Sequence, residues 1–328
     1  MPTPSLAGLM LDVPGGFTYP ATMEDSTCLS RGGLLRVFAG AVIISFSPVF
    51  VKMVDVGPSQ TAFYRLFFGG VALLAVALWR GQRFAAPKGV YAVTLGAALF
   101  FGFDLECWHR SILLVGPGLA TILGNFQVFL VALAGALLLR ERIPVRLLVA
   151  MPLAVAGLWL LLGVTPDSLS GDMLPGVGYG FATAFWYALY ILLLRRSQGM
   201  AGQLPAEANM ALVSLACAAL IGLGVLGRGG DFSIPDAGSL AVLLVYGVFC
   251  QGLGWLLLSS GLPRLPASLG GLVMLAQPAL AFVWDIVFFD RPTGPLGLVG
   301  ASLALFAIWL GLSSGGRRER VCRAGEDD

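Results

Sequence analysis

The sequence predicts an all-α integral membrane protein with ten transmembrane helices, arranged as two inverted repeats of five helices each. Apolar residues make up 57% of the 328 residues, and charged residues make up 12%, about half of the roughly 25% found in soluble domains. The chain has 44 glycines, nearly twice the usual ~7%, which is typical of closely packed membrane helices. Long apolar segments recur throughout, and the connections between them differ strongly in their Lys and Arg content.

Each predicted helix is an apolar segment close to the about 20 residues that cross the hydrocarbon core. In chain order, the segments of the first half are 34–54, 58–79, 90–113, 117–139 and 144–163. Those of the second half are 173–194, 206–226, 238–260, 265–289 and 294–314. Proline or arginine residues mark most of the boundaries, as at Gly57-Pro58, Gly116-Pro117, Pro144 and Arg195-Arg196. Within the first segment Pro48 removes a backbone hydrogen bond and permits a kink.

The distribution of Lys and Arg predicts the orientation in the membrane. With the N-terminus inside, the inner loops and tails hold fifteen of these residues, whereas the outer loops hold only Arg228 and Arg291. This bias places both termini in the cytoplasm of a multi-pass inner (plasma) membrane protein. Residues 1–33 are predicted to be a disordered cytoplasmic tail without the pattern of a signal peptide, and residues 315–328 a cytoplasmic C-terminal tail. Met1 and Met23 both fit as the start of translation.

Several function classes lack support in the composition. The net charge of +2 gives no electrostatic footprint for nucleic acid. The five cysteines show no paired or metal-binding spacing and His109 is the single histidine, so the sequence predicts no metal and no cofactor. A membrane-embedded enzyme would need clustered ligands or a nucleophile motif, and ATP-driven transport would need a glycine-rich phosphate loop, neither of which is present.

The two halves correspond loosely when the chain is shifted by 149 residues. Pro117 then falls on Pro266 and Glu141 on Asp290, and the stretch 117–162 matches 266–311. Because each half has five segments, an odd number, the second half must be inverted relative to the first. Inverted repeats with a site at their interface are typical of secondary transporters.

The chain resembles a known family in its repeated motifs. The stretch Leu138-Leu139-Arg140-Glu141-Arg142-Ile143-Pro144 and the stretches Leu265–Leu269, Gln277–Leu280 and Phe289–Arg291 are similar to EamA domains. These domains occur in tandem in the drug/metabolite transporter superfamily, which implies a first repeat at 34–163, a second at 173–314 and a central cavity. The sequence departs from the family pattern at Asp290, which replaces a glutamate. It departs again at Phe129, which matches Pro278 and predicts that the fourth helix lacks a proline kink.

Charged residues in the third segment are the first candidates for transport, since charge in hydrocarbon costs about 2.5–3.5 kcal/mol per residue. Helical phase places Asp104 and Trp108 on one face, and Glu106, His109 and Arg110 on another, where Glu106 and Arg110 can pair at i,i+4. Asp104, Glu106 or His109 would suit proton coupling. The alternative is a structural network in which Glu106 and Arg110 neutralise each other and Asp104 bonds to a neighbouring helix.

Polar and aromatic residues in other segments complete the candidate set. Arg65 could attract an anionic group, pair with Asp104 or extend toward the membrane surface. Asn125 could face Asp104 or the substrate, or it could form a hydrogen bond that holds two helices together. The remaining candidates are Trp186 and Tyr187, whose alternative role is packing, and Gln251 and Gln277, the better-buried polar residues of their segments.

These observations predict a secondary transporter that works by alternating access. The expected substrate is a small polar or amphipathic metabolite; the family resemblance implies export of amino acids or related compounds, and proton coupling is left open. A sugar-phosphate or nucleotide-sugar exchanger is the alternative, although it would call for several cavity cations and only Arg65, Arg110 and Lys52 are available. A membrane enzyme, channel or scaffold is the alternative from another class. The expected partners are the substrate and the lipid bilayer, and the sequence leaves open a homodimer.

Overall fold

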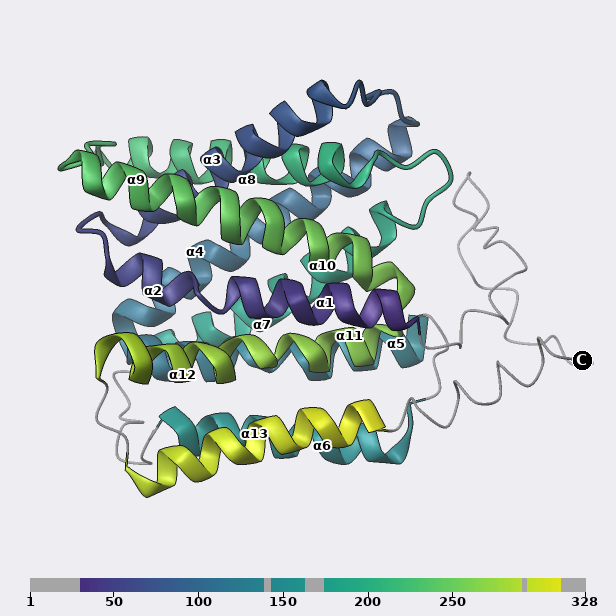
Figure 1. The fold of residues 1–328 in the computed structure, drawn as a ribbon, viewed down its shortest axis with the longest axis vertical. Coiled ribbons are helices and arrows are strands. Elements are labelled where there is room, and N and C mark those ends of the chain that lie inside the picture. Colours follow the sequence, from purple (N-terminus) through teal and green to yellow (C-terminus); the bar gives the residue numbers. More distant parts are fainter. Residues whose placement is uncertain (1–29, 139–142, 163–173, 291–293, 314–328) are drawn as a thin grey trace, which may run out of the picture.

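The fold is a bundle of helices that run side by side (Figure 1). The structure is a computed structural model that describes residues 30–138, 143–162, 174–290 and 294–313, which contain no strand. The helices of the first half are α1 (Arg31–Ile44), α2 (Ser47–Lys52), α3 (Pro58–Trp79), α4 (Lys88–Asn125), α5 (Gln127–Leu138) and α6 (Val145–Leu162). Those of the second half are α7 (Leu174–Ser197), α8 (Ala206–Gly227), α9 (Ala237–Tyr246), η5 (Gly247–Gly254), α10 (Trp255–Gly261), η6 (Leu262–Arg264), α11 (Ala267–Met274), α12 (Ala276–Phe289) and α13 (Pro295–Ser313).

The bundle has the surface of a multi-pass membrane protein. In the described part of the chain, seven helical stretches are long and apolar enough to cross a bilayer, and the shorter stretches Leu123–Leu137, Val145–Leu160 and Pro295–Gly311 are also apolar. Large apolar side chains such as Leu137, Leu223 and Trp309 are more than half exposed. A soluble protein rarely exposes so much apolar surface, whereas lipid covers it at no cost.

Helix α4 differs from the two separate segments that the sequence predicts around Gly116-Pro117. The backbone is helical from Lys88 to Asn125. However, the Asp104 carbonyl accepts a hydrogen bond from Thr183 Oγ1 at 3.4 Å, and a Cβ at Gly124 would lie 3.1 Å from Thr183 Cγ2. Twenty residues of straight helix span about 30 Å, so both ends of that stretch cannot meet one residue unless α4 doubles back between them. Both arms therefore pack along α7.

Three of the predicted membrane segments are interrupted within the bundle. The first breaks after Ile44, as Pro48 predicts. The others break at Phe126 and Leu275, which are separated by the same offset of 149 residues that relates the two halves. The expectation that Phe129 removes the kink of the fourth helix is therefore wrong. A break occurs without proline, beside an Asn125 side chain whose Nδ2 donates to the Thr121 carbonyl at 2.8 Å.

Close pairs of helices hold the bundle together. Helices α6 and α13 form one edge in Figure 1, while α3 and α8 lie near the opposite edge. Where α6 meets α13, a Cβ at Gly157 would lie only 2.5 Å from the backbone nitrogen of Ala304. Such backbone contacts need small residues, because packing rather than apolar burial drives helix association in lipid. The most extensive buried core lies among α1, α3, α4, α7, α8 and α10, around the polar cluster described next.

Candidate functional site

The candidate site is built on a close crossing of α3 and the π-helix η5. A Cβ at Gly69 would lie 2.6 Å from both the Gly247 carbonyl oxygen and Gln251 Cβ. Glycine at this point lets the two backbones touch. The crossing places Arg65, one turn away on α3, beside Tyr246 and Gln251.

The Arg65 guanidinium is held in place by neutral partners. Its Nε donates to Gln251 Oε1 at 3.1 Å, its Nη1 donates to Tyr246 Oη at 3.2 Å, and its central carbon lies 5.3 Å from the Tyr246 ring centroid. Gln251 is fully buried and donates in turn from Nε2 to Ser214 Oγ of α8 at 2.9 Å. A guanidinium has five N–H donors, so three of them have no acceptor among the described residues.

Asp104 is the charge of opposite sign at this level of the bundle. It lies on α4, is only 6% exposed, and interacts electrostatically with Arg65. Even so, no nitrogen of Arg65 lies within 4.0 Å of an Asp104 carboxylate oxygen, so the two do not form an ion pair. No donor among the described residues bonds the Asp104 carboxylate. A buried charge without a partner is costly, and in a membrane-spanning segment it marks a functional candidate.

An aromatic group lies against these charges. The Tyr190 ring packs 4.3 Å from that of Phe101 and 5.1 Å from that of Trp255, and Tyr187 lies 6.4 Å from Trp255 between centroids. The electrostatic influence of Asp104 and Arg65 reaches both tyrosines. Tyr190 Oη and Trp255 Nε1 are buried and have no hydrogen-bond partner among the residues that the structure describes. We call Arg65, Asp104, Tyr187, Tyr190, Tyr246, Gln251 and Trp255 the central cluster.

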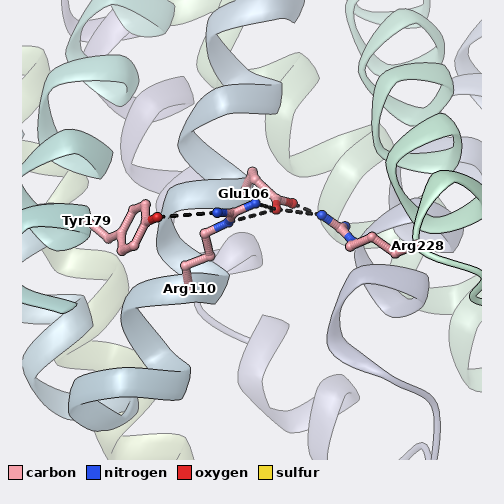
Figure 2. Close-up of polar contacts among 4 residues, drawn as sticks. All are labelled: Glu106, Arg110, Tyr179 and Arg228. Carbon is pink, nitrogen blue, oxygen red and sulfur yellow. Dashed lines mark hydrogen bonds and ion pairs between the residues drawn. The ribbon is translucent and has the colours of Figure 1, made fainter. Parts of the chain in front are cut away.

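A second polar network lies at the end of the bundle where α8 finishes, which we call the Arg228 end. Figure 2 shows Glu106 between two arginines: its Oε1 accepts from Arg228 Nη1 at 2.6 Å and from Arg110 Nε at 3.0 Å. Arg110 Nη1 also donates to Tyr179 Oη at 3.2 Å. The predicted pairing of Glu106 with Arg110 is confirmed. The network joins α4 to α7 and to the residue that follows α8.

The structure brings together four of the residues that the sequence singled out. Arg65, Asp104, Tyr187 and Gln251 all belong to the central cluster. Of the three alternatives for Arg65, direct pairing with Asp104 is not seen among the ion pairs of the described residues. Glu106 instead belongs to the network at the Arg228 end.

The other candidates lie elsewhere. Trp186 stacks on Phe100 at 5.5 Å rather than joining Tyr187. Trp108 packs against a small apolar cluster with the His109 ring 5.4 Å away, and the Asn125 amide bonds to its own helix rather than to Asp104. Gln277 Nε2 on α12 is buried, and no group in the described part of the chain bonds to it.

Tyr246 and Ser214 are site residues that the sequence analysis missed. Tyr246 and Gln251 are five residues apart, so in an α-helix they would differ in direction by about 140°. The π-helix η5 runs through this stretch, and its wider turn brings residues at i and i+5 to the same side. The glycines of η5 are the one sequence signal that could have revealed the change of period.

Two hollows of about 350 and 390 Å³ lie away from the charged groups. Both are lined by Phe126 and Phe129, beside the break between α4 and α5, and their other lining residues are also apolar or aromatic. They offer apolar surface rather than groups that recognise a polar ligand.

Comparison with known proteins agrees with this membrane architecture. The model of a family described as the EamA-like transporter family matches residues 31–163 and 174–313. The chain belongs to this family. It contains two tandem EamA domains, which places it among drug/metabolite transporters rather than in a family of enzymes.

Individual relatives cover most of the chain. The Pseudomonas aeruginosa protein PA1977, described as uncharacterized, is 33% identical over 74% of this chain and 83% of its own length. The threonine/homoserine exporter RhtA of Escherichia coli K12 is 30% identical over 80% of this chain and 83% of its own. A solved crystal structure matches with a TM-score of 0.75 at 20% identity, covering 85% of this chain and 98% of that one, and supports the fold alone.

Proposed function

We propose that this protein is a secondary transporter that exports a small polar or amphipathic metabolite of the amino-acid type across the inner membrane. The observation that carries the proposal is the central cluster, in which the half-buried Arg65 and the buried Asp104 interact without forming an ion pair inside the membrane-spanning part of the chain. Each such charge costs about 2.5–3.5 kcal/mol by insertion scales, and a role in binding substrate would explain why it is present. The similarity to RhtA supports an amino-acid-like substrate.

We further propose ten spans, in inverted repeats at 34–163 and 173–314, that alternate access between the two membrane faces. The seven long and three shorter apolar stretches support this count. The helix breaks at Phe126 and Leu275 support the repeat, because interrupted helices at equivalent positions mark the sites of inverted-repeat transporters. In this orientation both termini are cytoplasmic and the Arg228 end faces outward.

The central cluster disfavours the alternative functions. A sugar-phosphate or nucleotide-sugar exchanger needs several cations, and the cluster supplies only Arg65. A membrane enzyme needs a nucleophile or a base with an orienting partner, and a scaffold has no use for unpaired buried charges. Proton coupling through Asp104 remains part of the proposal, since a buried carboxylate can take up and release a proton during the cycle.

The test is uptake by the purified protein in proteoliposomes, with a panel of metabolites and with or without a pH gradient. We expect saturable transport of amino-acid-like compounds. Proton coupling predicts stimulation by the gradient and its loss in Asp104→Asn, so the absence of both would refute coupling. A topology map that places the 164–172 loop on the cytoplasmic side would refute the ten-span arrangement.

A further inference from the structure

We propose that the short helix α2 is a lid on the Arg65 side of the central cluster, hinged at the break between α1 and α2 and latched to α12 by Trp284. This inference rests on the proposed transport function, but it concerns how access to the cluster is controlled rather than which compound the cluster binds.

The first argument is the hinge. Helix α1 ends at Ile44, and the six residues of α2 begin at Ser47. Pro48 has no backbone N–H and so cannot donate to the Ile44 carbonyl, while the Phe46 N–H donates to the Ile43 carbonyl at 3.2 Å in a tighter turn. A helix interrupted by proline bends at a defined place, so α2 can turn as a unit relative to α1.

The second argument is what α2 covers. The Phe50 ring stacks on the Tyr246 ring, with centroids 5.7 Å apart and planes 24° apart. Tyr246 is only 3% exposed, and its hydroxyl accepts the hydrogen bond from Arg65 Nη1. Figure 1 shows α2 between α9 and α12, and it contacts both helices. An outward swing of α2 would therefore expose Tyr246, the group that holds Arg65.

The third argument is the latch that joins the hinge to α12. The Trp284 ring stacks on the Phe46 ring, with centroids 4.4 Å apart and planes 19° apart. Trp284 Nε1 also donates to Ser45 Oγ at 2.7 Å, and Ser45 is 1% exposed. A ring stack and an interhelical hydrogen bond are each weak in membrane proteins, so this latch can open and close instead of holding α2 permanently.

The fourth argument is how little of α2 is buried. Of its six residues, all of which the structure describes, only Val49 is buried, whereas α1 buries five residues. Val51 is 43% exposed, and Lys52 is exposed with its Nζ 4.7 Å from the Phe289 ring centroid. An element with few buried contacts opens at a lower free energy than the core beside it. Helix α2 is therefore easier to displace than α1.

Cys250 reports on opening of the lid. It is fully buried on η5, directly before Gln251, and its Sγ donates to the Ile43 carbonyl at 3.3 Å beside the hinge. It also interacts electrostatically with Arg65, so a reagent that reaches Cys250 has reached the edge of the central cluster. Alkylation by N-ethylmaleimide is measured on the purified full-length protein by peptide mass spectrometry, which distinguishes Cys250 from Cys217. The background carries Cys28→Ser, Cys107→Ser and Cys322→Ser.

Variants of the latch should expose Cys250. Trp284→Phe keeps an aromatic ring but removes the N–H, so we expect the rate of Cys250 alkylation to rise about three- to tenfold. Ser45→Ala removes the acceptor of the same bond and should have a similar effect, and the double variant should add little. Trp309→Phe alters an exposed tryptophan on α13 and should change nothing. An unchanged rate in Trp284→Phe, or an equal rise at Cys217 in the core on α8, would overturn the proposal.

Locking the lid tests whether α2 must move during transport. In the same background, Phe46→Cys with Trp284→Cys replaces the stacked rings by two thiols, which a short bis-methanethiosulfonate reagent joins. We expect the cross-link to stop uptake in proteoliposomes of the metabolite that the wild-type protein takes up, and reduction to restore it. Each single cysteine variant, treated in the same way, should keep its uptake. Unchanged uptake by protein whose cross-link is confirmed by mass would overturn the lid.

The lid and the transport function fail in different ways, because alkylation of Cys250 needs no substrate. Uptake that continues at the same rate in cross-linked protein would support the transporter and overturn the lid. Exposure of Cys250 in Trp284→Phe and Ser45→Ala, with no uptake of any compound by the wild-type protein, would support the lid and overturn the transport function.

Discussion

Removing the Glu106 carboxylate should open the Arg228 end of the bundle. Glu106 bonds two arginines at once, and through them it connects α4, α7 and the end of α8 (Figure 2). Glu106→Gln keeps the size of the side chain but removes its charge, so it weakens both ion pairs. The helices at this end should then separate more often.

The expected effect is modest because the network is partly exposed. The side chain of Glu106 is 34% exposed, and those of Arg110 and Arg228 are each 49% exposed. Pairs of this kind contribute roughly 0.2–1 kcal/mol each, so the two together stabilise the closed end by about 1 kcal/mol. Since 1.36 kcal/mol corresponds to a factor of ten, the open fraction should rise about fivefold.

Cys107 supplies a reporter for this opening. It is a free cysteine beside Glu106 and is only partly buried. In a background carrying Cys28→Ser and Cys322→Ser, the rate of Cys107 alkylation by a maleimide should rise about fivefold in Glu106→Gln. In the double variant with Arg228→Gln the effects should be less than additive, because both substitutions remove the same ion pair.

A matched ion pair provides the control. Arg80 Nη1 lies 2.5 Å from Glu207 Oε1, where α3 ends and α8 begins, at the opposite end of α8 from Arg228. Under alternating access, Arg80→Gln should not speed Cys107 alkylation and should slow it if the two ends are coupled. Unchanged alkylation in Glu106→Gln, or an equal increase in Arg80→Gln, would refute the reasoning.

Three further substitutions test the packing and the helix ends. Gly157→Ala should lower the free energy of unfolding by about 1–3 kcal/mol, seen as a lower melting temperature in detergent, because its Cβ would meet the Ala304 backbone; Gly178→Ala, which meets nothing within 4 Å, should change little. Asn209→Ala should cost about 1–2 kcal/mol by the same measurement, because it removes the acceptor of the buried Thr94 hydroxyl on α4 and the donor to Ser197 Oγ on α7. Hydrogen bonds from the backbone and side chain of the third residue of α9 lower the pKa of its cap, Asp236. The stabilisation should therefore be complete above the unfolded-state pKa of about 3.9 and lost as the pH falls through the lower folded pKa. The protection of the amides in the first turn of α9, measured against the intrinsic exchange rate at each pH, should fall at that low pH. At neutral pH it should fall in Asp236→Ala but not in Asp236→Asn.

Much of the membrane fold can be predicted from the sequence because apolar length and proline have direct local consequences. The break beside Pro48 follows from the missing backbone donor. The break at Phe126 has no such signal. There the Asn125 side chain competes for the Thr121 carbonyl, a contact that also occurs in continuous helices and so cannot be recognised in advance.

The site was harder to predict because helical phase identifies a face but not its neighbour. Asp104 and Gln251 were found because buried polar residues are rare in a membrane helix. Trp186 shares the helix of Tyr187, yet tertiary packing turns it toward Phe100. Tyr246 was missed because the π-helix changes the period, and the glycine contact that accompanies η5 depends on a partner helix far away in the sequence.

The central cluster and the Arg228 network share their helices, which gives a physical basis for coupling between them. Helix α4 carries Asp104 and, two residues later on its other face, Glu106; α7 carries Tyr187 and Tyr179; α8 carries Ser214 and leads into Arg228. A ligand that draws α4 toward Arg65 must therefore move Glu106 with it. Such coupling is reciprocal: if ligand binding closes the Arg228 network more tightly, then closing the network must also raise the affinity for the ligand. An alternating-access cycle requires this relation.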